Sequence, residues 1–298
     1  MFLKISREIA FVFYLNLKEI EGVLIMKKRS IVNRVLIVGM ALTMGLSLTA
    51  CGEATSTKSS ASSDDKKEIV LGIDDTFVPM GFKDENGDLV GFDVELAKAV
   101  GEKTGVDIKF QAIDWSMKES ELNSGNIDAI WNGYSVTDER KNKVDFSDVY
   151  LKNKQVIVTL SDSEIKTKAD LKGRKVGAQN ESSAVDAIEA EEGIEESFDG
   201  GKLITYETNN DALMDLENKR IDAIVADEIL VRYYMNERGE DKYKILDDDF
   251  GDEDYAIGVK KGNTELKDKI NEGLKKCNED GTSAKISEKW FGSDIVVK

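Results

Sequence analysis

The chain has 298 residues and a formal net charge of −17, and this length is enough for two modest domains. The acidity disfavours binding to nucleic acid or to anionic lipid headgroups, because both are polyanions. Histidine is absent, which excludes Ser-His-Asp and Cys-His catalysis and every zinc site that contains histidine. Cysteine occurs only as Cys51 and Cys277, which is too few for a disulfide framework.

The segment before Cys51 has the pattern of a bacterial secretion signal. A basic start at Met26 leads into an apolar run of signal-peptide length, which ends in the letters LTAC at 48–51. This ending resembles the lipobox of bacterial lipoproteins, in which small residues admit the signal peptidase and the cysteine carries a diacylglycerol. We therefore expect 26–50 to be a signal peptide and Cys51 to be lipidated. The alternative is an N-terminal transmembrane anchor with an incidental cysteine.

Two flanking segments complete this N-terminal region. Residues 1–25 do not fit a signal peptide, and we interpret them as an extension from a start codon placed too early. Residues 51–67 are rich in Ser, Thr and Lys, which favours a flexible tether between a membrane and a folded body. The expected location is therefore the extracytoplasmic face of the cell membrane, with a lipid anchor.

From Glu68 onward, strand-like and helix-like patterns alternate, which favours an α/β fold. Strands are predicted at 69–73, 106–110, 127–131, 155–160, 174–178, 203–206, 221–225 and 255–260. The first helix follows Gly91, carries Val94, Ala97 and Val100 on one stripe, and ends near Gly105. Further helices are predicted after Thr137, after the strands at 174–178 and 203–206, from Asp227 toward Asn236, and from a Thr264 cap to Gly281.

A sequence pattern that occurs twice suggests two similar α/β lobes. Residues 122–130, LNSGNIDAI, are matched by residues 216–224, LENKRIDAI. The first copy leads to hydroxyls and Arg140, whereas the second leads to Asp227, so a cleft between them would suit a zwitterion. Ligands of open α/β sheets bind beyond the carboxyl ends of the strands, which predicts a cleft formed by 74–77, 132–135, 179–183 and 226–228.

Six motifs occur in the order found in one protein family. They are DDTFVP at 74–79, GFDV at 91–94, TDERK at 137–141, DFS at 145–147, VGAQ at 176–179 and KWFG at 289–292. In these motifs the chain resembles the polar amino-acid-binding proteins of bacterial ABC importers, solute-binding protein family 3, over essentially all of 68–298. The resemblance implies a type II periplasmic-binding-protein fold, with two lobes that are joined by two extended crossover segments and close on a ligand.

Carried over to this sequence, the resemblance places lobe 1 at 68–150 plus 254–298, lobe 2 at 155–249, and the crossovers near 150–154 and 250–254. It implies a binding protein and not an enzyme, with an amino acid as ligand, a permease and its ATPase as partners, no cofactor or metal, and a monomeric chain. The alternative class is an enzyme, because a dehydratase of aromatic-amino-acid precursors uses the same fold. Asp227 or Glu228 would then supply the catalytic acid.

At the carboxylate end of the ligand, the resemblance implies Arg140 as the clamp, since a guanidinium can bind a carboxylate bidentately. Assisting hydroxyl and main-chain groups are expected at Gly133, Ser135, Ser182 and Ser183. The last two open a predicted helix, whose free backbone N–H groups attract anions. The structural alternatives are an exposed helix charge for Arg140, a plain turn at 133–135, and ordinary helix caps for the two serines.

At the other end of the ligand, the resemblance implies Asp227 as the partner of the α-ammonium. It also implies Phe77 and Trp115 as the rings that sandwich the ligand's side chain. As alternatives, Asp227 would be a helix N-cap, and both aromatic residues would belong to the core.

Two departures from the family bear on the choice of ligand. Glutamine-selective relatives carry a lysine where this chain has Gln179, and many relatives have glycine at the position of Glu181. Asp74 is present and no lysine lies in the predicted pocket, so a free side-chain carboxylate would be repelled there. We therefore expect arginine or lysine as the ligand, with cystine or another neutral polar amino acid as the alternative.

Overall fold

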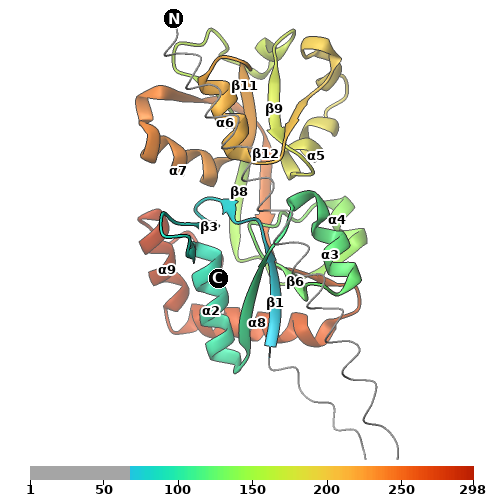
Figure 1. Cartoon of the computed structure of the whole chain (residues 1–298), viewed down its shortest axis with the longest axis vertical. Helices are drawn as coiled ribbons and strands as arrows, with labels where there is room; N and C mark the ends of the chain where they lie inside the picture. The colour runs from blue at the N-terminus through green and yellow to red at the C-terminus, as the bar shows by residue number, and fades with distance from the viewer. Residues whose placement is uncertain (1–67) are drawn as a thin grey trace, which may run out of the picture. The chain divides into compact units, whose positions relative to one another are not determined.

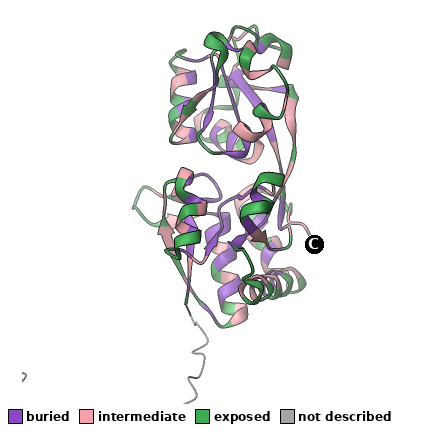
Figure 2. Ribbon diagram, turned by 90° about the vertical axis from the view of Figure 1, so that its right-hand side faces the viewer, coloured by how far each residue is buried: buried purple, intermediate pink, exposed green. Residues whose placement is uncertain are grey.

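A computed structural model describes residues 68–298, so the predictions for the N-terminal extension, the signal peptide, Cys51 and the tether lie outside the described residues. The described chain alternates strands and helices, and its strands form two five-stranded sheets and a three-stranded sheet. Figure 1 shows the two large sheets as the centres of two lobes, lobe 1 in the lower half and lobe 2 in the upper half. Buried residues follow the strands inside each lobe, whereas exposed residues cover the outer helices (Figure 2).

The sheet of lobe 1 has the strand order β5-β1-β6-β13-β7. Its strands are β1 (Glu68–Ile73), β5 (Asp107–Ala112), β6 (Ala129–Ile130), β7 (Val144–Phe146) and β13 (Gly258–Lys260). β1 runs parallel to β5 and β6, whereas β13 is antiparallel to β6 and β7. Because β13 lies between β6 and β7, the chain returns to lobe 1 after building lobe 2.

Helices pack around this sheet, and one small sheet precedes them. The helices are α2 (Phe92–Thr104), α3 (Lys118–Ser124), α4 (Asp138–Lys143), α8 (Thr264–Glu279) and α9 (Thr282–Phe291), with a 3-10 turn, η1 (Trp115–Met117), before α3. The small sheet is formed by β2 (Thr76–Phe77), β3 (Gly81–Lys83) and β4 (Leu89–Val90). α2 buries the predicted stripe of Val94, Ala97 and Val100 and packs on α8 and α9.

The sheet of lobe 2 has the strand order β10-β9-β11-β8-β12. Its strands are β8 (Leu151–Leu160), β9 (Val176–Gln179), β10 (Ile204–Tyr206), β11 (Ala223–Asp227) and β12 (Tyr243–Tyr255). The helices are α5 (Ser183–Glu189), α6 (Asn209–Glu217) and α7 (Glu228–Arg238), with 3-10 turns η2 (Lys168–Leu171), η3 (Glu195–Ser197), η4 (Asp199–Gly201) and η5 (Glu240–Lys242). β9, β10 and β11 are parallel, so their carboxyl ends meet at one edge of the sheet.

The two segments that connect the lobes are paired with each other. β8 and β12 run antiparallel, from Leu151 opposite Tyr255 to Leu160 opposite Tyr243. The predicted crossovers near 150–154 and 250–254 lie inside or directly at the ends of these strands. The connection is therefore a two-stranded ribbon held by backbone hydrogen bonds.

The structure corrects three sequence predictions. The strand predicted at 255–260 is two elements, because β12 ends at Tyr255 and β13 begins at Gly258. No strand is predicted at 243–254, because β12 contains six acidic residues and a glycine, which strands disfavour. The cap of α8 is Asn263, whose side chain accepts the N–H of Leu266 at 3.3 Å, and not Thr264. The strand predicted at 127–131 is reduced to the two residues of β6.

The core follows from these elements. Each sheet buries its central strands, and the apolar residues of β8 and β11, apart from the half-buried Leu160, are almost completely shielded from solvent. Within 68–298, every helix is too short or too polar to cross a lipid bilayer.

Gly91 allows the chain to turn from β4 into α2. Its φ of +136° and ψ of 170° lie in a region used essentially by glycine alone, and a Cβ there would be 2.3 Å from the Met80 carbonyl oxygen. We predict that Gly91→Ala lowers the free energy of unfolding in urea by about 3 kcal/mol. Gly87→Ala is the matched control, since Gly87 has φ of +85° but open space around it. This substitution should lower the free energy of unfolding by only about 1 kcal/mol. Equal losses in both variants would contradict this account of Gly91.

Candidate functional site

A small cavity lies between the two lobes, at the carboxyl ends of β1, β6, β9 and β11. Its lining contains all ten residues of the predicted site together with Asn132: Asp74, Phe77, Trp115, Asn132, Gly133, Ser135, Arg140, Gln179, Ser182, Ser183 and Asp227. Lobe 1 supplies the residues up to Arg140, and lobe 2 supplies the rest. The strand-end rule therefore brings together side chains that are far apart in the sequence.

Arg140 is buried at the boundary between the lobes. The Thr137 hydroxyl accepts the Arg140 backbone N–H at 3.2 Å and so caps α4 as predicted. The guanidinium donates to the carbonyls of Ser135 in lobe 1 and Glu181 in lobe 2, both at 3.2 Å. It also lies 4.8 Å from the centre of the Tyr134 ring. Only 3% of Arg140 is exposed, so it is not the solvated helix charge that the alternative interpretation expects.

The serine hydroxyls contribute polar groups from both lobes. The oxygens of Ser135 and Ser183 are 2.9 Å apart, which joins lobe 1 to lobe 2. Ser182 occupies the N-cap position of α5, but its side chain makes no capping hydrogen bond. Among the described residues, its buried Oγ has no hydrogen-bond partner, and neither has Nδ2 of Asn132. Both residues line the cavity, so a molecule bound there would be close to these unpaired atoms.

Asp227 is the last residue of β11 and precedes α7, but its side chain does not cap that helix. Its Oδ1 instead accepts hydrogen bonds from Asn153 at 2.7 Å, from Gln155 at 3.1 Å and from the Tyr255 hydroxyl. Burial, reinforced by the nearby Glu253 carboxylate, raises the pKa of Asp227 well above its usual range. Asp227 is therefore a buried acid at the cavity wall and not a helix cap.

Asp74 and Gln179 meet across the cavity from opposite lobes. Asp74 accepts hydrogen bonds from the backbone and hydroxyl of Thr76, at 2.9 and 2.6 Å, and from the Gln179 amide at 2.8 Å. The Asn209 side chain in turn donates to the side-chain oxygen Oε1 of Gln179 at 2.9 Å and fixes the orientation of the Gln179 amide. Burial raises the pKa of Asp74 although these hydrogen bonds act in the opposite direction.

The two predicted aromatic residues belong to the core and to the cavity wall at once. Phe77 is 6% exposed and packs into the main apolar cluster, while Trp115 is 8% exposed and meets the Tyr134 ring edge-on at 5.9 Å. Both rings also line the cavity. The core role given as the alternative therefore does not exclude contact with a ligand.

Gly133 is fixed by a buried acid that the sequence analysis does not identify. Its φ is +57°, and a Cβ would lie 2.8 Å from the Phe77 ring, so a larger residue would alter this wall of the cavity. Its N–H donates to Asp93 at 2.7 Å, and the Tyr150 hydroxyl donates to the same oxygen at 3.0 Å. The main-chain N–H of Gly133 is thus already used within the protein.

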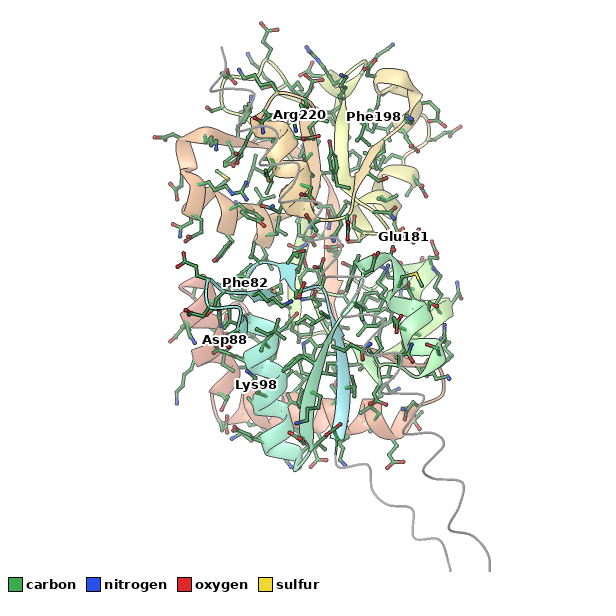
Figure 3. The ribbon with its side chains drawn as sticks, in the orientation of Figure 1. Phe82, Asp88, Lys98, Glu181, Phe198 and Arg220 are labelled. Atoms are coloured by element: carbon green, nitrogen blue, oxygen red, sulfur yellow. The ribbon has the colours of Figure 1, made fainter. Side chains whose placement is uncertain are left out.

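Lys118 and Glu181 form a second contact between the lobes that sequence reasoning misses. Lys118 is 1% exposed, and its ammonium donates to the Glu181 carbonyl at 2.9 Å, beside the bond from Arg140. Burial, and to a lesser extent Arg140, lowers the Lys118 pKa to about 8. Glu181 has φ of +54°, which is uncommon for a residue other than glycine, and Figure 3 shows it where lobe 2 faces lobe 1.

Residues 69–293 match the family described as bacterial extracellular solute-binding proteins, family 3. The chain belongs to this family. It is 33% identical over 254 residues to the arginine-binding extracellular protein ArtP of Bacillus subtilis (strain 168), a match that covers 85% of this chain and 95% of ArtP. It is 31% identical over 230 residues to the L-cystine-binding protein TcyJ of Escherichia coli (strain K12), covering 76% and 84% of the two chains.

Solved structures of solute-binding proteins have the same fold. A substrate-binding protein of an ABC uptake transporter from Streptococcus pneumoniae, determined with bound histidine, superimposes with a TM-score of 0.76 and 44% identity. The match covers 78% of this chain and 95% of that one. The prediction of a two-lobed α/β fold of the type II periplasmic-binding-protein class is therefore confirmed.

Asp93 makes the stability of this solute-binding protein depend on pH. Burial raises the pKa of Asp93 from 3.8, its value in the unfolded chain, to about 7 in the folded protein. Protonated Asp93 therefore contributes fully to stability below about pH 3.8, and this contribution is lost as the pH rises through 7. We predict that Asp93→Asn gains stability relative to wild type between about pH 5 and pH 8, by on the order of 2 kcal/mol. Urea unfolding across this range measures the difference. The control Asp88→Asn removes an exposed aspartate; parallel pH curves for Asp93→Asn and wild type would contradict the prediction.

Proposed function

We propose that this protein is the extracytoplasmic substrate-binding subunit of an amino-acid ABC importer, and that its cavity captures a basic L-amino acid when the lobes close. The observation that carries the proposal is the charge arrangement of the cavity. Its lining holds one cation, Arg140, and two acids, Asp74 and Asp227. A ligand with one carboxylate and two cationic groups complements these charges.

The α-amino and α-carboxylate groups of the ligand would bind at Arg140 and Asp227. The two hydrogen bonds that Arg140 makes to carbonyls use two of its five N–H donors, which leaves donors for a carboxylate. The hydroxyls of Ser135, Ser182 and Ser183 would add further contacts. The Asn153, Gln155 and Tyr255 side chains all donate their hydrogen bonds to Oδ1 of Asp227. Asp227 would therefore still be able to accept the ligand's ammonium.

The side chain of the ligand would extend toward Asp74. A carboxylate has about four acceptor sites, and Asp74 uses three for Thr76 and Gln179, so a cationic group can join or displace the Gln179 amide. Phe77 and Trp115 would cover the aliphatic stem and contribute cation–π attraction of about 0.5–2 kcal/mol. The arginine specificity in the name of ArtP and the histidine bound in the Streptococcus pneumoniae protein support this choice.

A neutral ligand is the second candidate for the same cavity. The L-cystine-binding relative supports it, and Gln179 provides both an amide donor and an amide acceptor beside Asp74. Catalysis by a dehydratase on this fold is less well supported, because the family is one of solute-binding proteins.

We further propose that the mature protein begins at Cys51 and is held at the membrane by a lipid on that residue. The support is the apolar run from Met26 and the small residues before Cys51. A lipid anchor would keep the binding protein near its permease while the 51–67 tether lets it reach the transporter. The folded body would act as a monomer.

Ligand selectivity should depend on Asp74. We predict that a thermal-shift panel of the common amino acids and cystine shows the largest stabilisation with arginine or lysine. Asp74→Asn should weaken the basic ligand by roughly 30-fold or more, because its distal cation loses a buried charged partner, and should change a neutral competitor only a few-fold. Titration calorimetry measures both.

The matched control is Asp75→Asn, which removes the same charge one residue further on. Asp75 pairs with Lys83 and does not line the cavity. The affinity of the Asp75→Asn protein for the ligand should therefore remain close to that of the wild type. Stabilisation by cystine or glutamine but not by arginine or lysine would refute the basic ligand and leave the importer function in place. Stabilisation by no amino acid would refute the importer function itself.

Membrane attachment should depend on Cys51. We predict that Cys51→Ala, expressed in a lipoprotein-processing bacterium, is released or left unprocessed, since several acyl chains are needed for stable anchoring. Fractionation and intact-mass spectrometry detect both outcomes, and Cys277→Ala is the matched control because Cys277 is a buried free thiol. Membrane retention and mass that stay unchanged in Cys51→Ala, apart from the substitution, would refute the anchor.

A further inference from the structure

A second carboxylate shares the hydrogen-bond donors of Asp227. Glu253 lies on β12, opposite Asn153 of β8, while Asp227 on β11 lies opposite Gln155 of β8. The Asn153 amide donates to Asp227 at 2.7 Å and to Glu253 at 2.6 Å. The Gln155 amide likewise donates to Asp227 at 3.1 Å and to Glu253 at 2.9 Å. Two acids on the strands that flank β8 are thus bridged by the same two amides of β8.

The charged groups around this pair are engaged elsewhere. Among the described residues, no Lys or Arg nitrogen forms an ion pair with Asp227 or Glu253. Lys152 of β8 pairs with Asp254 at 3.1 Å, Arg232 of α7 pairs with Glu228, and Arg140 of α4 lies 3.8 Å from Asp186 of α5. Tyr255, which is fully buried, donates to Asp227 and lies next to the Tyr150 ring.

Asp227 is buried and Glu253 is partly buried, and the shared amides hold the two carboxylates together without a cation among the described residues. A second carboxylate close by makes ionisation of Asp227 less favourable. The structure agrees with this, since burial and then the Glu253 carboxylate raise the pKa of Asp227 well above its usual range. A cation placed beside Asp227 would remove the conflict and favour its ionised form.

We propose that Asp227 holds a proton in the ligand-free protein and releases it to solvent when the ligand's ammonium binds, with Glu253, which the same two amides bridge to Asp227, acting as a positioning residue. The inference rests on the proposed function, because the ammonium is that of the captured amino acid. The charges balance: a neutral Asp227 and an ammonium give an ionised Asp227 with the ammonium and one free proton.

The consequence is that affinity depends on pH in a known direction. Where free Asp227 holds the proton and the complex does not, the dissociation constant falls by about tenfold for each unit that the pH rises. Above the range in which free Asp227 is protonated, affinity becomes independent of pH. The α-ammonium and the side-chain cation of arginine stay charged throughout this range.

The test is titration calorimetry with arginine on the wild-type protein, in buffers of different ionisation enthalpy and across about pH 5–8. The dependence of the binding heat on the buffer should reveal a release that approaches one proton per ligand at the acidic end of this range. There, the dissociation constant should fall by about tenfold for each unit that the pH rises. Normal binding with no proton release would overturn this inference and leave the proposed function intact. Absence of binding to every amino acid would overturn both.

Two variants locate the proton. Glu253→Gln keeps the side-chain size but removes the second acid, so proton release should fall toward zero and the pH dependence of affinity should flatten. Asp254→Asn, at the neighbouring residue paired with Lys152, should keep the wild-type proton count. Proton release that persists unchanged in Glu253→Gln would overturn the role of Glu253. Because the wild-type pH profile needs no variant, the inference stays testable if Glu253→Gln does not fold.

Discussion

The guanidinium of Arg140 is buried at the boundary of the two lobes, and the polar groups of the cavity are arranged around this buried charge. Arg140 is 3% exposed, and its hydrogen bonds reach a carbonyl in each lobe. A buried cation is stable only if nearby groups compensate it, and here carbonyl oxygens, the Tyr134 ring and the partly buried Asp186 do so incompletely. An anion that enters the cavity would complete this compensation, and the lobes would gain a common ligand at the point where they already touch.

Polar contacts join the lobes around the cavity, and the Phe82 ring of lobe 1 also packs against the Tyr233 ring of lobe 2, with 5.9 Å between their centres. Asp74 with Gln179, Ser135 with Ser183, and the Glu181 carbonyl with two cations are the hydrogen bonds around the cavity. The β8–β12 ribbon provides the permanent connection, and it also carries Asn153, Gln155 and Glu253. The residues that donate hydrogen bonds to Asp227 therefore lie on the strands that link the lobes.

Much of the fold and of the cavity lining could be predicted from sequence, for identifiable reasons. Apolar strands that end in glycine or polar residues indicate where a cleft lies, which predicts the segments 74–77, 132–135, 179–183 and 226–228. Trp115, in contrast, was placed in the site by the family resemblance. The strand β12 could not, because its acidic sequence is held in place by pairing with β8 and not by local preference. Lys118, Asn153 and Gln155 were missed because their partners are distant in sequence, and a polar residue in a helix or strand normally faces solvent.

The most direct test of the central claim, that Arg140 and Asp227 clamp an amino-acid zwitterion, compares arginine with agmatine, which lacks the carboxylate. Calorimetric affinities of both ligands for wild type and Arg140→Ala form a cycle that separates the carboxylate contact from any structural effect of the substitution. The account predicts that Arg140→Ala weakens arginine by roughly 30-fold or more and agmatine by less than about threefold. An equal loss for both ligands would show that Arg140 supports the fold without binding the carboxylate.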